Sequence, residues 1–257
     1  MRIIFILIIF ISANLFALDM KIKSKQYNNT TVVKALIGNK VEFHKLVKLQ
    51  KENHITNIKI KADDKLVLNM MLSKNISAKP MLKFKYKNID ANSLHVELKR
   101  VDSNIEKYTK KIQKVDRNIV LKPYLKLKNN PKKYKAKLKI IQKLYGDIIL
   151  TEDGIEIIAP DRASWGGSIP VAVRSIIQAK SLTLFVQVED VYDIRSNSIN
   201  KTMEFVCKWL ETPYSIVDNY IKIQMKHSGD IIVILEANDG KFYTAMKHIK
   251  VELAGEN

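Results

Sequence analysis

The sequence contains a single cysteine, Cys207, among its 257 residues. One thiol excludes an internal disulfide framework, and it excludes zinc and iron–sulfur sites built from clustered cysteines. Stability must therefore come from ordinary hydrophobic cores, which segments of about 90 to 110 residues are long enough to form.

Common catalytic and nucleotide-binding motifs are also missing: there is no G-x-G-x-x-G, G-x-x-x-x-G-K, G-x-S-x-G or H-E-x-x-H. The histidines show no metal-ligand spacing and no carboxylate partner in a known motif; they are His44, His54, His95, His227 and His248. The adjacent carboxylates Asp63-Asp64 and Glu189-Asp190 would point to opposite faces of a strand, which does not suit acid–base catalysis. We therefore predict no catalytic site, no metal site and no cofactor.

Only the N-terminus carries a long apolar run. A basic residue, Arg2, precedes the run at 3–11, and small residues lead to Ala17. This pattern predicts a secretory signal at 1–17 that is cleaved after Ala17; an uncleaved anchor is the alternative. We expect the mature protein to be periplasmic, with no stable membrane span once the signal has been removed.

Acidic residues are scarce in one stretch. The segment from Lys99 to Lys143 contains sixteen Lys and Arg but only three acidic residues, and this excess accounts for most of the formal charge of +18. Such a field attracts polyanions, anionic lipid or an acidic protein face, although a solvated linker gives the same composition. Aromatic residues are sparse there, and the predicted export excludes nucleic acid as a partner.

Short alternating segments fill the first half, and no strong helix is expected between them. Alternation of this kind is typical of antiparallel sheets with one buried face. The predicted strands are 20–25, 31–37, 55–61, 66–71, 81–87 and 93–100.

A connector over 101–146 separates the two halves. After Pro131, the apolar residues Tyr134, Leu138, Ile141 and Tyr145 fall on one stripe of a helix that would end at Gly146 and dock on a core.

Strands resume in the second half. They are expected at 155–158, 169–174, 181–188, 202–209, 219–225, 231–237, 243–245 and 248–253, with a hairpin turn at 238–240. The whole pattern predicts an all-β protein with two immunoglobulin-like β-sandwich domains joined by a basic, partly helical connector.

Two motifs of the second half carry a resemblance to a known family. The segment APDRASWGGSIPVAV begins at Ala159, and DGKFYTAMKHIKV begins at Asp239. They resemble the entry and exit of SoxY, one half of the SoxYZ sulfur carrier of thiosulfate oxidation. The resemblance implies a carrier cysteine on a glycine-rich arm after the last strand, where this sequence reads Ala254, Gly255, Glu256, Asn257.

The first half resembles SoxZ. MKIKSK and TTVVKALIGN, followed by NHITNIKIKADDKLVLNMMLSKNISAKPMLKFKYK, match the order of its strands and its S-K-N-x turn. The family's His-Pro-Met segment is replaced by 38–41. We therefore expect a signal peptide at 1–17, a SoxZ-like sandwich at 18–100, the connector at 101–146 and a SoxY-like sandwich at 147–257, with the two sandwiches packed against each other.

Cys207 is the one candidate thiol. Alternation places Met203, Phe205, Cys207 and Trp209 on one apolar face of a strand, which predicts a buried structural cysteine. The alternative is a relocated carrier cysteine, which would need exposure and a lowered pKa.

These observations give two hypotheses. The first is a non-catalytic periplasmic protein of the SoxYZ type that binds Sox-type partners without holding sulfur on its own C-terminal arm; the carrier function is then either lost or supplied by another chain. The second is an exported β-sandwich adhesion or binding module whose basic connector contacts acidic polymer or anionic lipid.

Overall fold

A computed structural model describes residues 19–38, 40, 42–118, 141–142, 145–146, 148–150, 154–189 and 201–252. Outside the described residues lie the predicted signal at 1–17, most of the connector helix, Asp190 and residues 253–257. The side chain of Glu189 is also outside the described part. No helix among the described residues is long and apolar enough to span a membrane.

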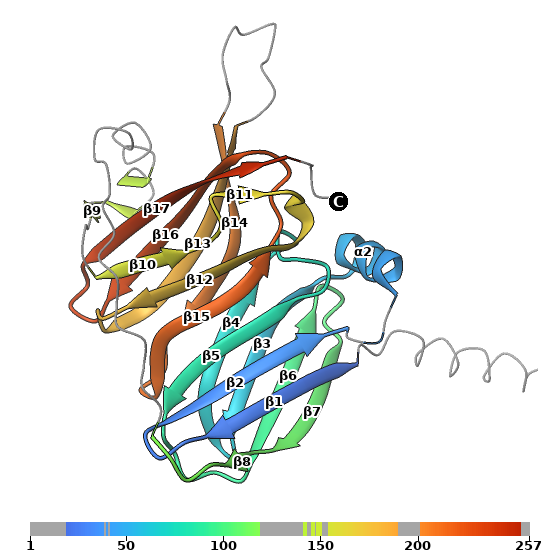
Figure 1. Ribbon diagram of the computed structural model, residues 1–257, viewed down its shortest axis with the longest axis vertical. Coiled ribbons are helices and arrows are strands. Elements are labelled where there is room, and N and C mark those ends of the chain that lie inside the picture. Colours follow the sequence, from blue (N-terminus) through green and yellow to red (C-terminus); the bar gives the residue numbers. More distant parts are fainter. Residues whose placement is uncertain are drawn as a thin grey trace, which may run out of the picture.

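The described chain folds into two sheets that face each other across one core (Figure 1). The seven-stranded sheet has the order β10-β12-β15-β5-β2-β1-β8. Its strands are β10 (Ile155–Ile158), β12 (Ile169–Ser175), β15 (Ser215–Ile223), β5 (Met81–Lys87), β2 (Thr30–Ile37), β1 (Met20–Gln26) and β8 (Gln113–Lys114).

The ten-stranded sheet has the order β11-β17-β16-β13-β14-β4-β3-β6-β7, with β9 also paired to β17. Its strands are β11 (Arg162–Ala163), β17 (Phe242–Val251), β16 (Gly229–Ala237), β13 (Ala179–Glu189), β14 (Lys201–Leu210), β4 (Lys65–Leu72), β3 (Ile55–Ala62), β6 (Ser93–Arg100), β7 (Ile105–Lys111) and β9 (Ile148–Leu150). The predicted all-β, immunoglobulin-like architecture is confirmed.

Each half contributes strands to both sheets, and the halves join edge to edge. Strand β15 of the second half pairs with β5 of the first, and β14 pairs with β4, both antiparallel. Figure 1 shows both pairs side by side near the middle of the molecule. Edge pairing satisfies backbone groups that would otherwise be open at the sheet edges. The predicted packing of the halves is thus a pair of continuous sheets, and one hydrophobic core runs through both.

Strand β16 is apolar without alternation, and both of its faces are buried. Ile231, Val233 and Leu235 face the shared core, whereas Ile232 and Ile234 face a second cluster on the outer side of the sheet. A strand buried on both faces reads as a continuous apolar run.

The connector closes that second cluster. Residues 141, 142 and 145 are helical, Ile141 is fully buried, and Tyr145 packs against Phe185 and Phe242. The turn ends at Gly146, whose φ of +78° favours glycine. Two members of the predicted stripe therefore dock on a core, while Tyr134 and Leu138 lie outside the described residues.

Three features differ from the sequence predictions. A helix, α2 (Phe43–Glu52), stands between β2 and β3, where no strong helix was expected. Its apolar residues Leu46, Val47 and Leu49 recur at helical spacing and pack on the core, but the helix is only ten residues long and gives a short signal in the sequence. The sheets also continue beyond residue 100 into β7 and β8, which the connector was expected to contain. Finally, the two pieces expected at 243–245 and 248–253 form the single strand β17.

Candidate functional site at the seam of the two halves

Cys207 lies at the seam, inside the shared core. On β14 it stands opposite Leu184 of β13 and Leu72 of β4, so it touches both halves of the protein. Its side chain is 0% exposed. Burial raises the pKa of the thiol well above its ordinary value, because the surroundings disfavour the charged thiolate. The thiolate is the nucleophilic form, so this cysteine is suited to packing and unsuited to sulfur chemistry.

A β-bulge in β14 changes the face on which its residues lie. Leu184 stands opposite Cys207 but Phe185 stands opposite Phe205, which leaves Val206 as an extra residue. Met203 and Phe205 therefore pack in the outer cluster, whereas Cys207 and Trp209 face the shared core. The prediction that these four residues share one face is wrong, because simple alternation does not survive a bulge.

The loop after β4 locks the seam. Ser73 donates its backbone N–H to the Val206 carbonyl at 2.9 Å and its hydroxyl to the Phe205 carbonyl at 2.6 Å. Asn75 also donates its side-chain amide to the Phe205 carbonyl, and Ile76 bridges to Ile223 of β15. This loop is the S-K-N-x turn quoted above, so a motif seen in the sequence makes the contact between the halves.

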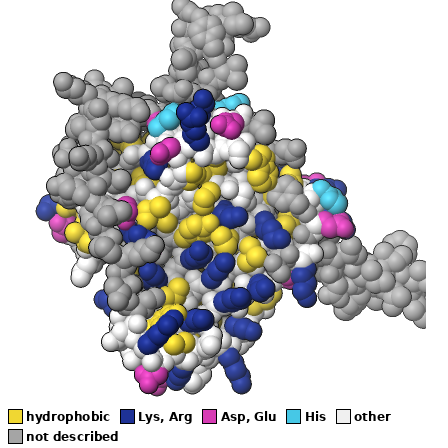
Figure 2. Space-filling view, viewed as in Figure 1, with side chains coloured by type: hydrophobic (Ala, Val, Ile, Leu, Met, Phe, Trp, Pro, Cys, Tyr) yellow, Lys and Arg dark blue, Asp and Glu magenta, His cyan; other side chains and the backbone are white. Residues whose placement is uncertain are grey.

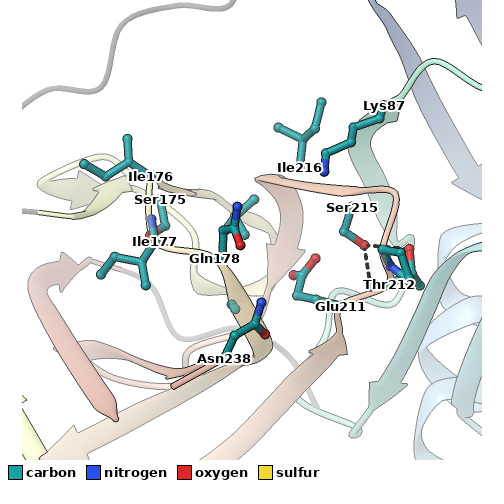
Figure 3. Close-up of a pocket in the computed structure, with 13 residues that line it drawn as sticks. Lys87, Ser175, Ile176, Ile177, Gln178, Glu211, Thr212, Ser215, Ile216 and Asn238 are labelled. Carbon is teal, nitrogen blue, oxygen red and sulfur yellow. Dashed lines mark hydrogen bonds between the residues drawn. The ribbon is translucent and has the colours of Figure 1, made fainter. Parts of the chain in front are cut away.

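A pocket of about 320 Å³ opens beside the seam. Lys87 comes from the first half, and the other lining residues come from the second half. Figure 3 shows the Glu211 side chain directed into this space, with Gln178 and Asn238 on one side and Ser215 on the other. The Ser215 hydroxyl accepts a hydrogen bond from the Thr212 backbone N–H at 2.8 Å, which fixes the turn between β14 and β15 beside Glu211.

Glu211 is the acidic group of the pocket. Burial raises the pKa of its carboxyl above the ordinary value of 4.5, and hydrogen bonds with Ser215 and Asn219 oppose that shift. The Asn219 side-chain amide lies 3.4 Å from the carboxyl. Among the described lining residues there is neither a histidine nor a second carboxylate, so Glu211 is the one acidic group that a ligand in this pocket would meet there. Glu211 could not be singled out from the sequence, because its burial depends on strands that are distant in the chain.

A buried charged network closes the core under α2. Arg100 is 3% exposed, and its Nε lies 2.8 Å from Glu106 while its Nη1 donates to the Asn53 carbonyl. The Tyr108 hydroxyl donates to the same Glu106 carboxylate at 2.5 Å. Burial and the neighbouring carboxylate raise the pKa of Tyr108 far above its ordinary value. The network is structural, since it compensates charges that the fold has removed from water.

The histidines of the sequence are dispersed. His44 contacts Glu42, His95 contacts Ser93 and Thr109, and His248 lies 3.0 Å from the buried Asp230. Burial lowers the pKa of His54, which lies below α2, while His227 is exposed. Within the described ranges, no group of three or more His, Cys, Asp or Glu is placed to hold a metal ion.

Asp63 has a turn role. It accepts hydrogen bonds from the Ser93 hydroxyl and from the backbone N–H groups of Asn92 and Ser93, and its φ of +50° places it at the tip of the β3–β4 hairpin. These bonds lower the pKa of its carboxyl. Asp63 is therefore occupied locally, as expected of a loop carboxylate.

Comparison with known proteins identifies both halves. The family model described as Sulphur oxidation protein SoxZ matches residues 20–113, and the model described as Sulfur oxidation protein SoxY matches residues 141–255. No curated protein matches the chain.

Several solved structures are similar to parts of the fold. The sulfur carrier protein SoxY from Chlorobium limicola f thiosulfatophilum is 22% identical, with a TM-score of 0.34, over 46% of this chain and 97% of that one. Superoxide reductase (neelaredoxin) from Ignicoccus hospitalis is 22% identical, with a TM-score of 0.31, over 38% of this chain and 80% of that one. Fibronectin(III)-like modules of Clostridium thermocellum CbhA are 9% identical, with a TM-score of 0.25, over 91% and 95%.

The two family matches follow each other in the order expected from the sequence motifs. The SoxZ match covers the first half of the fold, and the SoxY match covers the second half. The chain is a fused SoxYZ-like protein, with a SoxZ-type region ahead of a SoxY-type region.

Proposed function

We propose that this protein serves sulfur oxidation in the periplasm as a non-catalytic binding protein, which engages Sox-type partners without holding the sulfur on residues 19–252. The SoxZ and SoxY matches support a carrier-like role in sulfur oxidation. The periplasmic location rests on the signal pattern of residues 1–17.

One observation carries the proposal. The only thiol among the 257 residues is Cys207, and the core encloses it completely. A carrier thiol must be reached in turn by several enzymes, and it must react as the thiolate. A buried thiol at the seam of the two halves, with a raised pKa, meets neither requirement.

The fused arrangement suits binding. Two strand pairings and a shared core hold the SoxZ-type and SoxY-type regions as one body. Covalent linkage makes their association intramolecular, which removes its dependence on protein concentration. The combined surface of the two regions is therefore always available to a partner.

The test is a sulfur-transfer assay read by intact-protein mass spectrometry. The protein is incubated with thiosulfate and the purified Sox-type proteins of the source organism, and binding to each protein is measured separately by biolayer interferometry. We expect specific binding and no sulfur adduct on this chain. A covalent sulfur adduct, or the absence of binding to any Sox-type protein, would refute the proposal.

A second candidate function is favoured by β7. Its lysines Lys107, Lys110 and Lys111 are exposed on an edge strand, at the start of the basic stretch. An acidic polymer or anionic lipid could bind there. Changing these lysines to glutamine, which leaves the strand in place, should abolish salt-sensitive binding to anionic vesicles or heparin if this function holds.

A further inference from the structure

The outer face of the seven-stranded sheet carries a dense array of lysines. Strand β1 alternates exposed Lys21, Lys23 and Lys25 with buried residues. Strand β5 likewise alternates lysines with buried residues, with Lys83 and Lys87 exposed and Lys85 partly exposed. Figure 2 shows this face, with Lys and Arg side chains spread over it and apolar side chains between them. We call it the lysine face; its basic residues are Lys21, Lys23, Lys25, Lys34, Lys83, Lys85, Lys87, Arg174 and Lys222.

The strand register places three of these lysines in one row. Lys23 stands opposite Lys34, and Lys34 stands opposite Lys83 on the next strand. Neighbouring strands are about 4.8 Å apart, so three positive charges lie side by side, an arrangement that destabilises a sheet. The row continues into the second half at Tyr220, whose ring lies 4.7 Å from the Lys83 ammonium.

On the opposite sheet, charges of opposite sign stand across from each other on neighbouring strands. On its outer face, Lys59 stands opposite Glu97, and Glu97 stands opposite Lys107, so the charges alternate across the strands. Both rows belong to the same half of the protein and to strands of similar length. The like-charged row is therefore particular to the lysine face and does not follow from the lysine-rich composition alone.

On the lysine face, acidic side chains neutralise positive charge in one network of ion pairs that crosses the seam. Lys85 contacts Asp218, Arg174 lies 3.3 Å from Asp218, and Arg174 also lies 3.5 Å from Glu156. This chain uses two cations and two carboxylates and is neutral. Among the described residues, no carboxylate forms an ion pair with the other seven lysines, which are Lys21, Lys23, Lys25, Lys34, Lys83, Lys87 and Lys222.

Apolar side chains fill the spaces between the lysines. Val32, Leu36, Met81, Ile216 and Tyr220 are each partly exposed on the same face. A partner that covered them would gain the free energy of burying apolar surface in addition to charge pairing. Tyrosine at such a position is typical of protein interfaces.

We propose that the lysine face docks an acidic protein surface that carries carboxylates and apolar side chains in alternation. The partly buried apolar groups do not favour a membrane, because a bilayer requires side chains that protrude into it. The most exposed of the large apolar residues, Ile176, Ile105 and Val101, lie away from these rows. A free polyanion would pair with the lysines but would leave the apolar groups in water. The proposal names the surface for the partner binding suggested above and so rests on that proposed function.

The experiment compares two triple charge reversals in the full protein. K23E/K34E/K83E changes the row, and K61E/K65E/K99E is the matched control, with the same change in net charge on exposed lysines of the other sheet. Binding is measured by biolayer interferometry against each purified Sox-type protein of net negative charge, against vesicles of phosphatidylglycerol and phosphatidylcholine, and against heparin. Circular dichroism verifies that both variants are folded.

We expect one acidic Sox-type protein to bind the wild-type and control proteins within about twofold, and the K23E/K34E/K83E variant at least about tenfold more weakly, since like charges then face each other. If that protein binds all three forms equally, the lysine face is not the docking surface, although the proposed function stands. If no Sox-type protein binds, both proposals fail. If only vesicles or heparin bind, and only the row variant loses that binding, the face recognises lipid or polymer and the present proposal is overturned.

Discussion

Replacing Leu98 by alanine in the first half should destabilise the second half as well. Leu98 lies on β6, is 0% exposed and belongs to the core that runs through both halves. The seam joins the two halves within each sheet, through the β4–β14 pair in one sheet and the β5–β15 pair in the other. Neither half can therefore unfold without exposing edge strands and core of the other. The protein should therefore unfold as one cooperative unit.

The size of the effect follows from the burial of the side chain. A fully buried leucine replaced by alanine loses about 2 to 5 kcal/mol of folding stability, because a cavity remains. In a protein of about 150 to 250 residues, 1 kcal/mol shifts the melting temperature by about 2 to 4 °C. A loss near 3 kcal/mol therefore predicts a fall of about 6 to 12 °C.

Tryptophan fluorescence makes the assay specific to one half. Both tryptophans, Trp165 and Trp209, belong to the second half, and Trp209 is 3% exposed in the shared core. The Leu98→Ala variant should show the same lowered midpoint by fluorescence and by far-ultraviolet circular dichroism, while Lys99→Ala, at an exposed neighbouring position, should change it little. A fluorescence midpoint that stays at the wild-type value would show that the halves unfold separately, and the continuous-sheet account would be wrong.

Three further predictions concern charged groups. Arg100→Met should cost about 3 to 5 kcal/mol in chemical denaturation, because it leaves the partly buried Glu106 carboxylate without its cation. Arg100→Lys should not restore the loss, since lysine lacks the guanidinium donor to the Asn53 carbonyl, and full rescue by lysine would contradict this geometry. The pKa of Glu211 is raised in the folded state, so the folded state binds this proton more tightly than the unfolded state, and stability falls as the pH rises through the window above 4.5. Glu211→Gln should therefore raise the melting temperature at pH 7 and change it little at pH 4. An equal change at both pH values would argue against the shift. Lys34→Glu should raise the melting temperature slightly at low salt, because it replaces repulsion from Lys23 and Lys83 with attraction, and a fall would indicate that the row is not strained.

Much of the strand order could be predicted from the sequence because most strands bury one face. In β5, the alternation of Leu82, Phe84 and Tyr86 with lysines matches the observed burial residue by residue. The turn at Asn238-Asp239-Gly240 is also as predicted, with Gly240 at a φ of +83°. Local patterns of this kind depend on near neighbours in the chain.

Features that depend on distant strands were not predicted. The bulge at Val206 appears only once β13 has paired with β14, and it changes the faces of the residues before it. Helix α2 is only ten residues long, so the helical spacing of its apolar residues is a short signal, and β7 is largely exposed and has no clear period. The seam pairings join segments more than a hundred residues apart, for which a single sequence carries no register signal.

The candidate site shows the same division. Cys207 could be singled out because it is the only cysteine, and its apolar neighbours predicted a buried position. Glu211 and the lysine face could not be found in this way, although the alternating lysines of β1 and β5 were visible in the sequence, because their alignment depends on strand register.

The most direct test of the central claim is the rate at which a maleimide labels Cys207 in the native protein, followed by intact mass. Labelling should require unfolding, since the thiol is enclosed at the seam of both halves. With a stability of only about 5 kcal/mol, labelling in buffer should be about three to four orders of magnitude slower than in denaturant. Labelling at comparable rates in the two conditions would show a reachable thiol, and Cys207 would then have to be considered as a sulfur carrier.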